Sequence, residues 1–278
     1  MKRRNTDTGE AFMSIKIETI KTVSFEMEYC KFGTGSKIMV VIPGLGIRSV
    51  MESADFIAEA FSLFHEKYTI YVFERRKELP PVYNVHDMAR DTAVALDALG
   101  IKDAYFFGIS LGGMISQVIA AERPDLVHKL LLGSTCGKVD GTSAEGIGEW
   151  IKFAESGRAA ELCHGFAEAV YTPELLKRNN KAFTYLAKIT TDDELKRFVI
   201  LSKGVIGFDM LSKLYKIQCP VLVLGGGKDK LMCRKDFETL AERTHGELYI
   251  FEDGYHSIYD EEPEFRNRAF EFFERDEK

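Results

Sequence analysis

A serine flanked by glycines is the residue with the clearest chemical potential in this chain. Residues 108–112 read Gly-Ile-Ser-Leu-Gly and stand between the apolar run 104–107 and a helical pattern over 111–123. This context predicts a sharp turn between a strand and a helix, with Ser110 at its tip. Glycine suits such a turn because neighbouring backbone comes too close for a side chain. The first N–H groups of the helix would favour negative charge there, so we predict a nucleophile rather than an ordinary turn residue.

A serine hydroxyl needs a base to act as a nucleophile at neutral pH. Of the six histidines, His256 follows the strand-like segment 248–251 and precedes the last helical pattern. A loop at the carboxyl end of that strand could reach Ser110, so His256 is the predicted base. His245 is a weaker candidate because it precedes the same strand and is expected near the opposite edge of the sheet.

The base must be oriented by an acceptor at its second nitrogen. Asp229 is the predicted acceptor, because it follows a strand-like apolar run and three glycines that permit a sharp turn. The chain order Ser110, Asp229, His256 is one of the known orders of such a triad. An aspartate in this position often caps a helix or a turn instead. Asp253 lies too close to His256 in the chain to face its ring easily, and Asp140 is a weaker alternative.

Acyl transfer also needs hydrogen-bond donors for the oxyanion that develops at the attacked carbonyl. One donor is expected to be the backbone N–H of Leu111, the residue after the serine. The second is expected from the loop after an earlier central strand, where residues 43–46 read Pro-Gly-Leu-Gly. We assign it to the N–H of Leu45; the alternative is that this segment is only a turn.

These residues depend on a sheet that brings strand ends together. Residues 14–136 and 218–278 alternate between strand-like and helix-like segments, which predicts one α/β core domain with a mostly parallel central sheet flanked by helices. We expect a hairpin over 15–31, strands at 37–42, 68–73, 104–107, 130–132, 221–224 and 248–251, and helices near 50–66, 86–99, 111–123, 234–243 and 263–275.

The middle of the chain lacks strong strand signals. Residues 137–217 contain helical patterns at 149–155, 159–171, 173–189 and 192–201. This length is far beyond that of a single crossover connection. We therefore predict a helical cap, or lid, inserted after the sixth strand.

Charge and composition exclude several classes of protein. A net charge of −6 disfavours a nucleic-acid partner, which usually meets a basic face. No apolar run reaches the roughly 20 residues of a membrane span, and the basic start is not followed by the apolar stretch of a signal peptide. We therefore expect a cytoplasmic protein without membrane insertion. Residues 1–13 are expected to be a flexible leader, with Met13 as an alternative start to Met1.

No pattern calls for a metal or a cofactor. The five cysteines form no Cys-x-x-Cys pair, so they are expected to be buried thiols. Residues 225–228 read Gly-Gly-Gly-Lys but lack the spacing of a phosphate-binding loop. A dinucleotide-binding glycine motif after a first strand is also missing.

From residue 38 onward, the chain resembles the α/β-hydrolase superfamily in its capped, serine-nucleophile branch. The resemblance rests on the strand and loop at 40–46, the serine turn at 108–113, and the segments that carry Asp229 and His256. It implies a carboxylesterase-like hydrolase with the α/β-hydrolase fold. Two departures stand out: Pro-Gly replaces the frequent His-Gly at 43–44, and Glu-Arg-Arg-Lys replaces Asp-x-Arg-Gly at 74–77, in what we expect to be a loop near the cleft entrance.

The resemblance leaves the substrate open. The expected substrate is a small, largely apolar molecule with an ester-like bond. The protein itself is expected to be a monomer or a homodimer. The same fold and triad could instead cleave carbon–carbon bonds or act as an acyltransferase or perhydrolase. A ligand-binding member without turnover and a structural partner in an assembly are the non-enzymatic alternatives.

Overall fold

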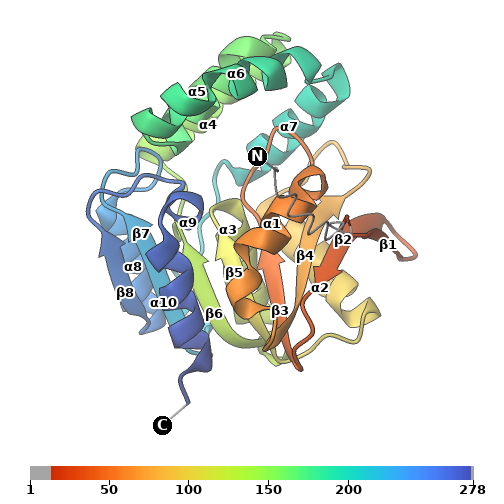
Figure 1. Ribbon diagram of the computed structural model, residues 1–278, viewed down its shortest axis with the longest axis vertical. Helices are drawn as coiled ribbons and strands as arrows, with labels where there is room; N and C mark the ends of the chain where they lie inside the picture. Colours follow the sequence, from red (N-terminus) through yellow and green to blue (C-terminus); the bar gives the residue numbers. More distant parts are fainter. Residues whose placement is uncertain (1–13, 277–278) are drawn as a thin grey trace, which may run out of the picture.

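A central sheet of eight strands organises the protein, whose computed structural model describes residues 14–276 (Figure 1). The predicted leader, residues 1–13, lies outside the described residues. The strands are β1 (Ile17–Lys21), β2 (Glu26–Phe32), β3 (Lys37–Ile42), β4 (Tyr68–Arg76), β5 (Ala104–Ile109), β6 (Val127–Gly133), β7 (Val221–Gly226) and β8 (Glu247–Phe251). Their order across the sheet is β1-β2-β4-β3-β5-β6-β7-β8. β2 pairs antiparallel with both β1 and β4, and the six strands β3 to β8 run parallel to one another. The predicted fold class is confirmed.

Helices cover both faces of this sheet. They are α1 (Ala54–Ala60), α2 (Val85–Ala98), α3 (Leu111–Glu122), α8 (Arg234–Thr244), α9 (Ile258–Glu261) and α10 (Pro263–Glu274). Side chains of α2, α3 and α8 join one core cluster with Phe106 of β5, while α1 and α10 join a second cluster with Phe107. Successive residues of a strand face opposite sides, so one apolar strand contributes to both cores. This explains why every residue of β5 and β7 is buried.

Four helices stand between β6 and β7 and form a separate layer above the carboxyl ends of the parallel strands (Figure 1). They are α4 (Gly141–Glu155), α5 (Ala159–Val170), α6 (Pro173–Ile189) and α7 (Asp192–Val205). This layer lies where a cap was predicted, and the division of the chain into two domains stays a prediction. α4 begins eight residues before its predicted start at 149, because buried Ser143 and Ile147 anchor its glycine-containing first turns.

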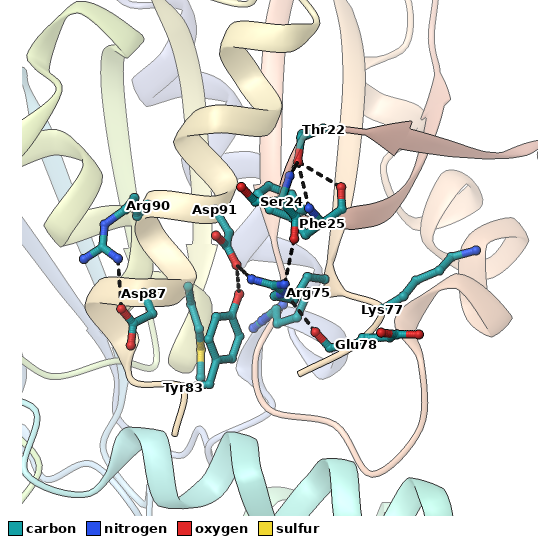
Figure 2. Close-up of polar contacts among 12 residues, drawn as sticks. Thr22, Ser24, Phe25, Arg75, Lys77, Glu78, Tyr83, Asp87, Arg90 and Asp91 are labelled. Carbon is teal, nitrogen blue, oxygen red and sulfur yellow. Dashed lines mark hydrogen bonds and ion pairs between the residues drawn. The ribbon is translucent and has the colours of Figure 1, made fainter. Parts of the chain in front are cut away.

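Two segments of the core differ from the elements predicted from the sequence. The single helix expected over 50–66 is broken into α1 and short 3₁₀ turns at Val50–Ser53 and Ser62–Phe64. Residues 74–76 were expected in a loop, but β4 continues to Arg76, because Arg76 is still paired with Met27 of β2. Asp91 of α2 contacts this strand end: its carboxylate pairs with Arg76 at 3.4 Å. The same carboxylate accepts the Tyr83 hydroxyl at 2.8 Å (Figure 2). The extension matters because it fixes the side chain of Arg75.

Membrane-spanning helices and metal-binding clusters are both absent from residues 14–276. None of their helices combines the length and the apolar character needed to cross a membrane. None of their His, Cys, Asp and Glu side chains gather in a group of three or more that could hold a metal ion.

Candidate active site

Ser110 occupies a strained turn between β5 and α3. Its φ of 50° and ψ of −119° lie in a region that residues with side chains rarely adopt. The surrounding backbone holds this conformation: the Ser110 N–H donates to the Gly133 carbonyl at 2.9 Å. The Thr135 hydroxyl donates to the Ser110 carbonyl at 2.7 Å. Leu111 follows as the first residue of α3, so its N–H is among those without an acceptor inside the helix.

Close packing around this turn explains its glycines. A Cβ at Gly108 would lie 2.5 Å from the Ser116 hydroxyl, and one at Gly112 would lie 1.8 Å from the Ile42 carbonyl oxygen. Because α3 meets the end of β3 at Gly112, only glycine fits without moving one of the two elements.

Replacing Gly112 with alanine is therefore expected to destabilise the protein. Overpacking of this kind costs about 1–3 kcal/mol. Gly148 in α4 provides a matched control, because a Cβ there meets nothing within 4 Å. Gly148→Ala should stabilise the protein by about 0.5–1 kcal/mol, since glycine is unfavourable inside a helix. Urea unfolding of both variants checks the contrast; a Gly112→Ala variant as stable as the natural protein would contradict it.

Ser110, His256 and Asp229 form one chain of hydrogen bonds. His256 Nε2 lies 3.1 Å from Ser110 Oγ, and His256 Nδ1 lies 2.7 Å from Asp229 Oδ2. The side chains of His256 and Asp229 are 3% and 0% exposed, so water does not compete for these contacts. A carboxylate can only accept, so Nδ1 carries a proton and Nε2 is left to accept the serine proton. The arrangement can therefore deprotonate Ser110 as it attacks.

Backbone groups fix the carboxylate of Asp229. Its Oδ1 accepts the N–H of Leu231 at 2.8 Å and that of Met232 at 3.0 Å. The Lys228 N–H donates to the Gly254 carbonyl at 2.8 Å, which joins the loop after β7 to the loop that carries His256. A Cβ at Gly226 would lie 2.5 Å from the carbonyl oxygen of Tyr255. The glycines noted in the sequence thus let these two loops pack against each other.

The weaker candidates lie away from this chain of contacts. The Asp253 side chain is 90% exposed and pairs with Lys228 at 2.7 Å. Asp140 is 67% exposed and pairs with Lys138 at 3.0 Å. His245 ends α8 in a left-handed conformation, just before β8. Their surroundings indicate surface ion pairs and a helix end.

The loop after β3 passes beside the serine. A Cβ at Gly44 would lie 3.2 Å from Ser110 Cβ. Leu45 and Leu111 both line a small cavity of about 40 Å³ together with Ser110 and His256. The two residues predicted to supply oxyanion donors are therefore placed on the wall of the cavity that contains the serine hydroxyl.

A second, larger cavity of about 780 Å³ adjoins the first between the sheet and the helical layer. Its walls include Phe56 of α1, Phe166 of α5, and Phe183 and Leu186 of α6. Charged side chains also line it, among them Arg48, Glu74, Arg75, Arg197, Asp260 and Arg266. Burial raises the pKa of the Asp260 carboxyl to about 6, against the opposing effect of Arg266. The two cavities share walls at Gly44, Leu45, Leu111, Phe166 and Tyr259, so they are neighbours.

Sequence analysis did not identify three residues that support the site: Arg75, Arg197 and Glu261. Arg75 donates to carbonyls of the loop after β3, and Arg197 of α7 donates to the Arg75 carbonyl at 3.3 Å. Glu261 of α9 accepts the Thr172 hydroxyl at 2.5 Å and also binds the Ser257 hydroxyl, which ties the helical layer to the residue after His256. No local pattern marks these residues, because their partners are far apart in the chain.

Comparisons with known proteins agree with this fold. The MGS-M2 α/β-hydrolase from a Medee basin deep-sea metagenome library superposes with a TM-score of 0.85 at 21% identity, covering 94% of this chain and 98% of the other. The 3-oxoadipate enol-lactonase 2 of Acinetobacter baylyi is 22% identical over 91% of this chain and 95% of its own length. Serine hydrolase BPHL of Mus musculus is 26% identical over 89% of this chain and 82% of its own.

The fold is that of an α/β-hydrolase, as the sequence resemblance implied. A family model described as serine aminopeptidase, S33, matches residues 81–264, which is more than half of the chain and includes Ser110, Asp229 and His256. The chain belongs to this family of hydrolases.

Proposed function

We propose that this protein hydrolyses ester-like bonds in small molecules through a Ser110–His256–Asp229 triad and an acyl-enzyme. The chain of hydrogen bonds from Asp229 through His256 to Ser110 Oγ carries the proposal. His256 Nε2 takes the serine proton while Oγ attacks the carbonyl carbon, and Asp229 stabilises the imidazolium that forms. The N–H groups of Leu45 and Leu111 hold the oxyanion. His256 then protonates the leaving alcohol and activates the water that releases the acid.

The two cavities differ in volume, which suggests that the two substituents of the scissile bond differ in size. A volume of about 40 Å³ holds roughly three water-sized groups. One substituent of the scissile bond should therefore be short, with the other in the 780 Å³ cavity. The helical layer would exclude water from both.

Two series of esters test this arrangement. One varies the acyl chain on a constant alcohol, and the other varies the alcohol on a constant acetyl group. We expect kcat/KM to fall steeply with length in one series and to change little in the other. Two flat series or two steep series would contradict the assignment of a short and a long side.

Trp150 of α4 lines the small cavity, so Trp150→Ala should relieve the limit and raise activity on the longer members of the steep series. Phe153 lies on the same helix but does not line either cavity, so Phe153→Ala is the matched control.

The nucleophile itself is tested by a fluorophosphonate, which phosphonylates activated serines. Mass spectrometry should find the adduct on the peptide that contains Ser110. Inactivity on every ester together with labelling at Ser110 would favour carbon–carbon hydrolysis or acyl transfer to an acceptor other than water. Inactivity without labelling would favour the ligand-binding alternative.

A further inference from the structure

A buried arginine donates hydrogen bonds to the loop that carries the proposed oxyanion donor Leu45. Arg75 is 4% exposed and lies on β4, next to β3 in the sheet. Its Nη2 donates to the Pro43 carbonyl at 2.5 Å and to the Gly44 carbonyl at 3.2 Å. A buried guanidinium costs free energy unless it is hydrogen-bonded, and the two contacts of Nη2 with loop carbonyls offset part of that cost.

The Gly44 carbonyl and the Leu45 N–H belong to the same peptide group. A peptide group is planar and trans, so its C=O and N–H point in opposite directions. A donor that fixes the Gly44 oxygen therefore fixes the direction of the Leu45 N–H. It also polarises the peptide, which strengthens the hydrogen bond that this N–H can donate.

The residue before Arg75, Glu74, holds the far end of the same loop. Glu74 accepts the Ser49 hydroxyl and the Val50 N–H, both at 2.9 Å. It also pairs with Arg197 of α7 at 3.5 Å. The segment from Pro43 to Val50 is thus fastened at both ends by the consecutive residues Glu74 and Arg75.

We propose that Arg75 is a positioning residue that orients the Gly44–Leu45 peptide so that the Leu45 N–H faces the oxyanion. This inference rests on the proposed function, because it concerns the stabilisation of a tetrahedral intermediate formed at Ser110. Arg75 acts through the loop and does not touch the reacting carbonyl.

Chemical rescue separates positioning from simple packing. Arg75→Ala should lower kcat about 100-fold, the order of magnitude seen when one oxyanion donor is lost, while KM changes little. Arg75 lines the large cavity, so free guanidinium can enter the space left by the truncated side chain. Millimolar guanidinium chloride should restore much of the kcat of Arg75→Ala, and an equal concentration of sodium chloride should not.

Arg75→Met is the second variant, because methionine fills the space and keeps the fold without donating a hydrogen bond. It should show the same loss of kcat, and guanidinium should not relieve it. Arg76→Gln is the matched control on β4: Arg76 follows Arg75 on the strand and faces the other way, donating to the Ser24 carbonyl at 3.0 Å and the Glu78 carbonyl at 2.8 Å. Its kcat should match that of the natural protein.

A kcat near the natural value in Arg75→Met, or an equal response of both variants to guanidinium, would overturn the positioning role. These outcomes leave the proposed function intact as long as Ser110→Ala is inactive. Activity that persists in Ser110→Ala would instead overturn the proposed function, whatever the Arg75 variants do.

Discussion

Replacing Ser110 with alanine is expected to lower kcat on a responsive p-nitrophenyl ester by about six orders of magnitude, as for the nucleophile of another serine hydrolase. The hydroxyl that His256 contacts at 3.1 Å would be gone, so no acyl-enzyme could form. Binding should survive, because the cavity walls are unchanged. Steady-state hydrolysis measures the loss of kcat, and a fluorophosphonate labelling assay measures the loss of the reactive hydroxyl.

The fold should tolerate this change, since alanine is smaller than serine and faces the same backbone strain at a φ of 50°. Ser62→Ala, at an exposed serine outside both cavities, is the matched control and should keep full activity. Substantial turnover by Ser110→Ala would show that another residue supplies the nucleophile.

Asp229→Asn is expected to lower kcat by about four orders of magnitude, as at the corresponding aspartate of a related triad. An amide keeps the shape of the carboxylate, but its NH₂ group can face Nδ1 only if that nitrogen gives up its proton. The proton then moves to Nε2, which can no longer accept from Ser110 Oγ. Because the Asp229 side chain is fully buried, water cannot take the place of the carboxylate.

Asp253→Asn is the matched control for this prediction. Asp253 stands three residues from His256 but is 90% exposed and pairs with Lys228, so its loss should change kcat very little. If Asp253→Asn and Asp229→Asn were equally impaired, the acid of the proposed triad would be wrongly assigned. Hydrolysis of one ester at saturating concentration compares the two variants directly.

Local patterns were sufficient to place Ser110, Asp229 and His256 at the ends of strands. The serine turn needs glycines at 108 and 112 because of close backbone contacts, and the physical demand is visible in the residue types. The buried strands could be predicted because continuous apolar runs are the signature of a sheet covered on both faces. Their boundaries were less certain, since a strand such as β4 continues as long as its neighbour offers partners.

The sequence by itself determined the fold class, the position of the helical layer between two strands, and the three side chains of the proposed triad. Each of these depends on a periodicity or a turn within a few residues of chain. Tertiary structure alone decided that Arg75 lies beneath the loop of Leu45, that Glu261 joins α9 to the helical layer, and that a small and a large cavity meet beside Ser110. These features arise from residues distant in sequence that share one buried space, and no local pattern encodes which distant partner a polar side chain will meet.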